Sequence, residues 1–347
     1  MDPVRLLLIS STAVVSLLLL IEWNQYSDSH KKQQSDLYAA AVLETPVTEE
    51  KSSFSAIDEG IPSVSAPVAA LTETRDQAAS FFLNTDAINL AISMDGGDIT
   101  GASLPKFPVR LDTPDQPFRL LESNALRTYV AQTGLIGPDG IDASGDRARY
   151  VSQGIDVGAD GSHTLTLAWI GNDPLGLQVF KQITAYDNQY VVDVTFDIRN
   201  NSGQSVEVTS FAQLKRDNSE APDANVGFGV SPYLGAALTQ PEERYTKLTF
   251  SDLQDEPFSK NLPAGWVAIL QHYFVSAWIP SQTESHDFFA SQLSNGDNVI
   301  GYKNAGVSID AGDQHTISQR LYVGPKDQVV LGGLAENLDL VIDYGWL

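Results

Sequence analysis

The side chains in this sequence best suited to moving a proton near neutral pH are five histidines. They are His30, His163, His272, His286 and His315. None is followed by a second histidine four residues later, so the spacing does not predict a metal-binding pair on a helix. His272 lies in an apolar run, where we interpret it as a hydrogen-bonded histidine near a strand surface, with a catalytic base as the alternative.

Two kinds of glycine-rich segment resemble ligand-binding loops. Residues 296–303, GDNVIGYK, superficially resemble a phosphate-binding loop, but Tyr302 separates Gly301 from Lys303, and Asn304 follows instead of Ser or Thr. We therefore predict a turn between two strands. The segments GPDGIDASGDR (137–147) and DVGADGSH (156–163) lack the ligand pattern of an EF-hand and are predicted to be surface turns.

The sequence singles out no reactive centre of another kind. There is no Gly-x-Ser-x-Gly elbow, and cysteine is absent, which excludes disulfides and thiol nucleophiles. The carboxylates are too numerous for an acid and base pair to be chosen. We predict no catalytic, cofactor-binding or metal-binding residues, no cofactor and no enzymatic activity.

The charge balance excludes one class of partner. The chain has 44 acidic and 21 basic residues, a formal net charge of -23. Nucleic-acid binding requires a basic surface, so we predict no nucleic-acid partner. The same balance argues against broad electrostatic docking onto anionic lipid headgroups.

The N-terminus carries the strongest physical signal. Sixteen uncharged residues, 6–21, lie between Arg5 and Glu22. As a helix they would cover roughly 24 Å, slightly less than a hydrocarbon core of about 30 Å. A cleaved signal peptide is the alternative, but no small-residue cleavage site follows closely. We predict that residues 1–26 form an uncleaved transmembrane signal anchor that contacts the lipid bilayer.

Composition divides the rest of the chain into three parts. Residues 27–79 are rich in Ser, Glu, Ala and Pro without periodic apolar positions, which predicts a flexible polar linker. Residues 80–325 show short alternating strands separated by turn residues, which predicts a large antiparallel β-sandwich. The clearest strand is 191–200, whose apolar face would hold Val192, Val194, Phe196 and Ile198. Another alternating run covers 88–94, and the Asp-Gly-Gly sequence at 95–97 predicts a turn after it. Residues 265–280 are almost continuously apolar and are predicted to be one strand buried on both faces.

Residues 326–347 change pattern again. Val329, Val330, Leu334 and Leu338 have near-helical spacing, although glycines at 332 and 333 weaken a helix interior, so we predict a short C-terminal helix. We further expect three residues after it to pack against the sandwich and the last few to resemble a membrane-interface segment, with Trp346 poorly buried. The three packing residues are Leu338, Leu340 and Ile342.

Ordered motifs along the chain resemble the YidC-type membrane protein insertases, the bacterial branch of the YidC/Oxa/Alb family. The motifs occupy residues 6–21, 92–99, 120–123, 133–140, 209–215, 265–280, 300–312, 321–328 and 338–347. The resemblance implies a β-supersandwich similar to galactose mutarotase, placed in the periplasm of a Gram-negative bacterium. It implies an N-terminus in the cytoplasm, an orientation that the flanking charges leave open, because Arg5 favours it while Lys31 and Lys32 oppose it.

The resemblance also implies a role and partners. The family assists the insertion and folding of nascent inner-membrane proteins, alone or with the Sec translocon, and its periplasmic domain is linked to the SecDF accessory complex. The family's insertion groove lies in a helical bundle that we expect beyond Leu347, so none of its residues is assigned here. Two alternatives remain: a periplasmic carbohydrate- or peptide-binding module, and a mutarotase-like enzyme that would need a histidine and a carboxylate converging in a cleft.

Overall fold

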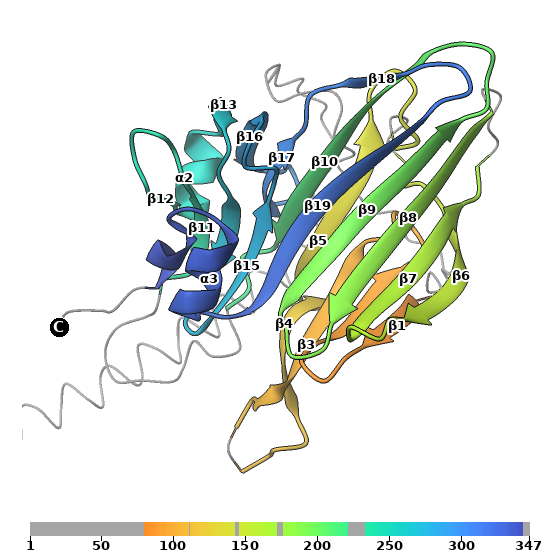
Figure 1. The fold of residues 1–347 in the computed structure, drawn as a ribbon. Coiled ribbons are helices and arrows are strands. Elements are labelled where there is room, and N and C mark those ends of the chain that lie inside the picture. The colour runs from red at the N-terminus through yellow and green to blue at the C-terminus, as the bar shows by residue number, and fades with distance from the viewer. Residues whose placement is uncertain (1–79, 111, 143–145, 172–175, 221–232, 343–347) are drawn as a thin grey trace, which may run out of the picture. The chain divides into compact units, whose positions relative to one another are not determined.

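The computed structural model describes residues 80–110, 112–142, 146–171, 176–220 and 233–342 (Figure 1). The predicted anchor, the predicted linker and the expectation for Trp346 fall outside these ranges. Among the helices of the described residues, none is both long and apolar enough to cross a bilayer.

The described residues are mainly β and form two antiparallel sheets, as predicted (Figure 1). Within these ranges the first sheet has ten strands: β1 (Ser80–Asn84), β2 (Asn89–Ser93), β3 (Ile99–Pro108), β4 (Pro117–Ser123), β5 (Thr128–Ile136), β10 (Val206–Arg216), β17 (Asn298–Lys303), β16 (Ser285–Gln292) and β13 (Phe258–Pro263) in spatial order, with β18 (Val307–Ile309) on β10. The second has nine: β12 (Thr246–Leu248), β11 (Gly235–Leu238), β14 (Val267–Leu270), β15 (Phe274–Ile279), β19 (Gln314–Pro325), β9 (Val191–Asn200), β8 (Leu177–Tyr186), β7 (Ser162–Trp169) and β6 (Tyr150–Val157).

The main apolar core contains residues from both sheets, because each strand turns alternate side chains toward it. Strand β9 follows the predicted alternation: Val192, Val194, Phe196 and Ile198 are at most 1% exposed. The predicted turn after β2 is also confirmed. There Gly96 and Gly97 adopt φ of +76° and +60°, values that favour glycine, and β2 pairs with β3 in an antiparallel hairpin.

The prediction of a single strand over residues 265–280 is wrong. The run forms β14 and β15, which pair as a hairpin around Gln271–Tyr273. The predicted burial on both faces is confirmed: Ile269 and Trp278 pack into the main core, while Ala268 and Val275 pack into a second cluster on the opposite face. The nearly continuous apolar run predicted the burial correctly. It did not predict the turn, because residues 271–273 contain none of the usual turn residues Gly, Pro, Asn or Asp.

The second cluster is covered by the C-terminal elements, α3 (Gln328–Leu334) and the 3-10 helix η1 (Leu338–Val341). The short helix was predicted, but its buried face was not. Leu331 is buried, whereas Val329 is 86% exposed. The predicted packing is confirmed for Leu338, which is fully buried, and for Ile342, which packs against the second cluster. It is wrong for Leu340, which is 40% exposed; Val341 is buried instead, because a 3-10 turn repeats every three residues rather than every two.

One further helix, α2 (Phe250–Asp255), packs against the first sheet beside β16. Thr249 caps it, since the Thr249 hydroxyl accepts a hydrogen bond from the backbone N–H of Asp252 and the Asp252 carboxylate accepts one in return.

Candidate functional site

A buried ionic cluster lies between the two sheets. The guanidinium of Arg147 forms ion pairs with Asp98, in the β2–β3 turn, and with Asp142, at 2.8 Å. Asp142 also accepts backbone hydrogen bonds from Leu135 and Ala148. Burial disfavours the charge on Arg147, but the two carboxylates outweigh it and raise the pKa of the guanidinium.

Lys181 of β8 completes this cluster. Its ammonium group donates hydrogen bonds to the carbonyl oxygens of Gly96, at 2.7 Å, and Thr133, at 3.1 Å. It also lies 5.2 Å from the centre of the Phe196 ring. The side chain is only 1% exposed, and burial lowers the pKa of Lys181 from 10.5 to about 7.

The ionic cluster is a structural element rather than a binding site. The Lys181 ammonium and both Asp142 carboxylate oxygens are occupied by partners within the protein. The prediction that residues 137–147 form a surface turn is therefore wrong for Asp142, which is 1% exposed, and for Arg147, whose side chain is 8% exposed. Asp and Gly are common in surface turns, and the sequence contained no signal that these two charges meet an ammonium group contributed by β8.

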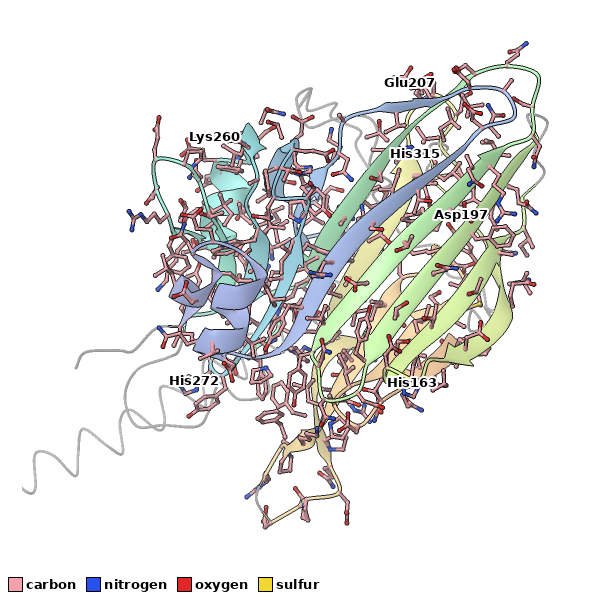
Figure 2. The ribbon with its side chains drawn as sticks, viewed as in Figure 1. His163, Asp197, Glu207, Lys260, His272 and His315 are labelled. Carbon is pink, nitrogen blue, oxygen red and sulfur yellow. The ribbon has the colours of Figure 1, made fainter. Side chains whose placement is uncertain are left out.

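The described histidines are scattered and do not form a common site (Figure 2). His163 lies 3.3 Å from Asp187 at the surface, and His315 belongs to β19. His286 is 1% exposed, and its Nε2 donates a hydrogen bond to the Ser281 carbonyl oxygen at 2.8 Å. His30 lies outside the described residues.

His272 occupies the β14–β15 turn, not a strand surface as we predicted. Its ring stacks on Tyr273 with the ring centres 3.8 Å apart. Within the described part of the chain, its buried Nδ1 has no hydrogen-bond partner. Among the described residues no carboxylate is paired with His272, whereas a mutarotase-like mechanism would require one.

The two remaining loop predictions have different outcomes. Residues 156–163 include the exposed β6–β7 turn, where Asp160 accepts hydrogen bonds from Ser162, as expected of a surface turn. In residues 296–303 the turn is limited to the start, at Gly296, and the rest is strand β17, with Gly301 in its interior. Across the described residues, no three His, Cys, Asp or Glu side chains gather as metal ligands.

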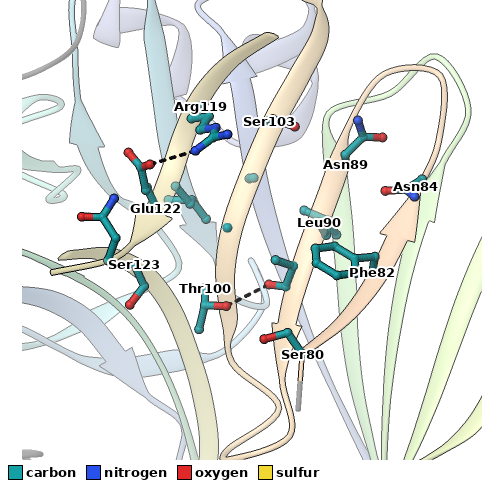
Figure 3. Close-up of a pocket in the computed structure, with 15 residues that line it drawn as sticks. Ser80, Phe82, Asn84, Asn89, Leu90, Thr100, Ser103, Arg119, Glu122 and Ser123 are labelled. Carbon is teal, nitrogen blue, oxygen red and sulfur yellow. Dashed lines mark hydrogen bonds and ion pairs between the residues drawn. The ribbon is translucent and has the colours of Figure 1, made fainter. Parts of the chain in front are cut away.

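A groove on the outer face of the first sheet is the best candidate for ligand contact (Figure 3). Its volume is about 560 Å³, and strands β1 to β4 line it. Phe82 is 63% exposed beside it, and Arg119 and Glu122 form an ion pair of 3.2 Å on its lining. The remaining polar lining consists of uncharged hydroxyl and amide side chains: Ser80, Asn84, Asn89, Thr100, Ser103, Ser123 and Asn124.

The side chains of the groove are better suited to binding a ligand than to catalysing a reaction. An exposed aromatic ring with hydroxyls and amides can bind an extended polypeptide or a sugar through stacking and hydrogen bonds. No histidine lines the groove, and Glu122 is paired with Arg119. Sequence reasoning reached this surface only through the family motif at 120–123, because a groove assembled from four strands leaves no local pattern.

Comparison with known proteins identifies the family. Residues 81–347 match the family described as the YidC periplasmic domain. The "Membrane protein insertase YidC" of Azotobacter vinelandii is 37% identical over 356 residues, covering 100% of this chain and 63% of that protein. The protein of the same name from a Marinomonas species is 41% identical over 268 residues, covering 76% of this chain and 48% of that protein. The chain therefore belongs to the YidC family and contains its periplasmic domain, and its relatives are named insertases rather than enzymes.

Solved structures give weaker likenesses. A galactose mutarotase related enzyme from Lactobacillus acidophilus is 10% identical with a TM-score of 0.47, covering 71% of this chain and 97% of that one. A GH36 alpha-galactosidase from Geobacillus stearothermophilus is 10% identical with a TM-score of 0.49, and the match covers 74% of this chain and 42% of that one. At this level of likeness the matches carry no argument about activity.

Proposed function

We propose that this chain is part of an insertase that assists the insertion and folding of inner-membrane proteins in a Gram-negative bacterium. The observation that carries the proposal is the family match over residues 81–347, together with relatives named membrane protein insertases. The chain spans 63% of the length of the Azotobacter relative. The complete insertion activity is therefore proposed for the whole protein, with the insertion groove in a region corresponding to the relative's remaining length.

In this proposal the chain has four parts. Residues 1–26 anchor it in the inner membrane with the N-terminus in the cytoplasm, and residues 27–79 are a flexible polar linker. Residues 80–325 form a periplasmic β-supersandwich of the galactose mutarotase type, and residues 326–347 lead toward the membrane region. The uncharged run at 6–21 and the strand and helix boundaries support this division.

The proposed partners follow from the family resemblance. They are nascent inner-membrane proteins, the Sec translocon and the SecDF accessory complex. The exposed Phe82 ring and the hydroxyl and amide side chains of the groove support a role in holding a partner.

The test is complementation of cells depleted of their own insertase. One strain expresses this chain alone, and a second expresses it joined to the part of the Azotobacter relative that this chain does not cover. We expect the joined protein, but not the chain alone, to restore protease-protected insertion of a membrane reporter. Restoration by the chain alone would overturn the assignment of insertion to the remaining region, and failure of both proteins, at normal expression, would contradict the insertase role.

The groove favours a second candidate function, binding of an extended peptide or a carbohydrate. Phe82 provides an exposed ring beside hydroxyl and amide groups, the combination such ligands use. The test is photocrosslinking of nascent chains, and titration with oligosaccharides, for the Phe82→Ser and Ile170→Ser variants. Ile170 is a matched control, since it is 56% exposed and does not line the groove. Equal binding by both variants and the unmodified chain would reject this role for the groove.

A further inference from the structure

Exposed apolar side chains gather at one end of the domain. Val329 and Val330 of α3 are 86% and 41% exposed, Tyr273 of the β14–β15 turn is 54% exposed, and Val109, which follows β3, is 46% exposed. The three elements that carry them are far apart in the sequence. We call these four residues the apolar end surface.

Contacts between the elements place these residues at the same end. The backbone N–H of Lys326 donates a hydrogen bond of 2.9 Å to the carbonyl oxygen of Tyr273, so α3 begins beside the hairpin tip. Phe274, the next residue, has its ring centre 5.5 Å from that of Phe107, which is two residues before Val109. Figure 2 shows the hairpin tip, labelled by His272, beside the lower end of α3.

The exposed valines are held outward by the structure of α3. The Asp327 side chain accepts hydrogen bonds from the backbone N–H groups of Val329 and Val330, which fixes the first turn of the helix. Leu331 is fully buried in the second cluster, so the opposite face of α3 must point away from the domain. These valines are not isolated apolar residues on the surface. They belong to an ordered helix, and a second exposed apolar side chain, that of Tyr273, lies on the neighbouring hairpin tip.

We propose that the apolar end surface rests on a lipid bilayer, with its side chains inserted at the level of the headgroups. This inference rests on the proposed function, which places the chain at a membrane. The described chain ends at Ile342, directly after η1, and η1 packs against α3 beside this surface. The sequence that follows contains Tyr344 and Trp346, residue types enriched at membrane interfaces, and the chain covers 63% of the Azotobacter relative.

The chemistry of the apolar end surface selects the mode of binding. Lys326 and Asp327, which carry opposite charges, both precede the valines, and Arg110, next to Val109, is paired with Asp112. The surface therefore offers no excess of positive charge, and the whole chain carries -23. Attraction to anionic headgroups would need such an excess, so the contact is apolar and forms on a zwitterionic bilayer without dependence on salt.

The absence of cysteine from the sequence permits a clean experiment. A single cysteine is placed by Val329→Cys, Tyr273→Cys or Val109→Cys and labelled with a fluorophore. The control is Ile170→Cys, which is 56% exposed just beyond β7, at the end of that strand away from the β8–β9 turn. That turn lies at the same end as the apolar end surface, because the ring centre of its Tyr190 is 6.0 Å from that of Phe107. Eight residues of strand β7 separate Ile170 from that end by about 26 Å. The full chain is reconstituted in phosphatidylcholine vesicles containing lipids with a nitroxide quencher near the headgroup.

We expect the lipid-borne quencher to reduce fluorescence at 329, 273 and 109 at least about twofold more than at 170, at low and high salt, because inserted side chains lie about 5–10 Å into the interface. Quenching equal to that at 170 would overturn the proposal. So would protection from aqueous iodide without quenching by lipid, which would indicate a protein partner or a second copy. Vesicle flotation is measured in parallel. A chain that floats without quenching contradicts only the docking surface, whereas a chain that does not float contradicts the proposed membrane anchor itself.

Discussion

The ammonium group of Lys181 lies 2.7 Å from the carbonyl oxygen of Gly96, so a cation on β8 of one sheet holds the β2–β3 turn of the other. The turn can approach because Gly97 has no side chain. A Cβ atom there would lie 2.9 Å from the Cδ atom of Lys181. The hairpin, the buried lysine and the glycine pair therefore depend on each other.

Replacing Lys181 is expected to remove a pH dependence of stability. Burial lowers the pKa of Lys181 from 10.5 to about 7 in the folded protein. Below pH 7 both the folded and unfolded chains carry the proton, and the cost of burying the charge is fully present. Between pH 7 and 10.5 only the unfolded chain keeps the proton, so the free energy of unfolding rises with pH, by at most about 1.4 kcal/mol per unit.

The measurement is urea unfolding of the unmodified chain and Lys181→Met from pH 6 to pH 9. Relative to Lys181→Met, the unmodified chain should gain roughly 3 kcal/mol of unfolding free energy between pH 6 and pH 9. Arg147 also donates to the Thr133 carbonyl, so methionine does not leave that oxygen unpaired. The exposed Lys106→Met variant is the control and should follow the unmodified chain. Parallel curves for all three proteins would show that Lys181 is charged throughout.

Removing Arg147 is expected to be far more damaging than removing a neighbouring arginine. Arg147→Met would leave Asp98 and Asp142 buried without their cation, at a cost of about 3–5 kcal/mol. Arg149 forms a 3.4 Å pair with Asp95 at the surface, where its side chain is 76% exposed, so Arg149→Met should cost less than about 1 kcal/mol. Chemical denaturation of both variants measures the difference, and similar losses would contradict a structural role for the ionic cluster.

The sequence predicted the features that depend on local pattern. Alternation in β9 and the glycine turn after β2 reflect constraints within a few residues, and both are confirmed. The β14–β15 turn was missed because residues 271–273 contain no Gly, Pro, Asn or Asp, the residue types that usually mark a turn, and the polar pair Gln271 and His272 was interpreted as part of one strand. The buried face of α3 was predicted wrongly, because the apolar residues against which α3 packs belong to β14 and β15, which lie far from α3 in the sequence.

The candidate site could not be predicted for a related reason. The groove combines residues of four strands, and the ionic cluster brings Asp142 and Lys181 together across two sheets. Sequence spacing reports on neighbours along one element, while these arrangements depend on pairings between elements. Only the resemblance to the insertase family, carried by ordered motifs over the whole chain, identified the class of protein.

The C-terminal elements are expected to depend on one buried tryptophan. The Nε1–H group of Trp266 donates a hydrogen bond of 3.1 Å to the carbonyl oxygen of Glu336, which joins α3 to η1. Trp278 is equally buried, but its Nε1 has no hydrogen-bond partner among the described residues. Both Trp→Phe changes remove volume from the interior, and only the change at 266 also leaves a carbonyl without its donor.

We therefore expect Trp266→Phe to increase protease cleavage within residues 328–341 by roughly tenfold, which corresponds to about 1.4 kcal/mol of lost local stability, while Trp278→Phe leaves this region protected. Limited proteolysis followed by mass spectrometry locates the cleavage sites. Equal protection of the segment in both variants would show that apolar packing alone holds the C-terminal elements.

Gly301 is expected to tolerate no side chain, although it lies in regular strand. It is in β17, between β10 and β16, where it is paired with Gln213 and Phe289. A Cβ atom would collide with the Ala212 carbonyl oxygen and come within 2.7 Å of the Gln213 Cβ. Both obstacles belong to, or lie next to, backbone in a central strand, so they cannot rotate away. Gly301→Ala should therefore destabilise the protein by about 3 kcal/mol or more.

The matched control is Gly203→Ala, because a Cβ at Gly203 meets nothing within 4 Å and this glycine does not have a positive φ. That change should alter the free energy of unfolding by less than about 0.5 kcal/mol. Thermal and urea unfolding of the two variants measure the contrast. If Gly301→Ala proved as stable as Gly203→Ala, β10 and β17 would have to separate more easily than their central position in the sheet indicates. The glycine that suggested a phosphate-binding loop in the sequence is needed instead for the close approach of neighbouring strands.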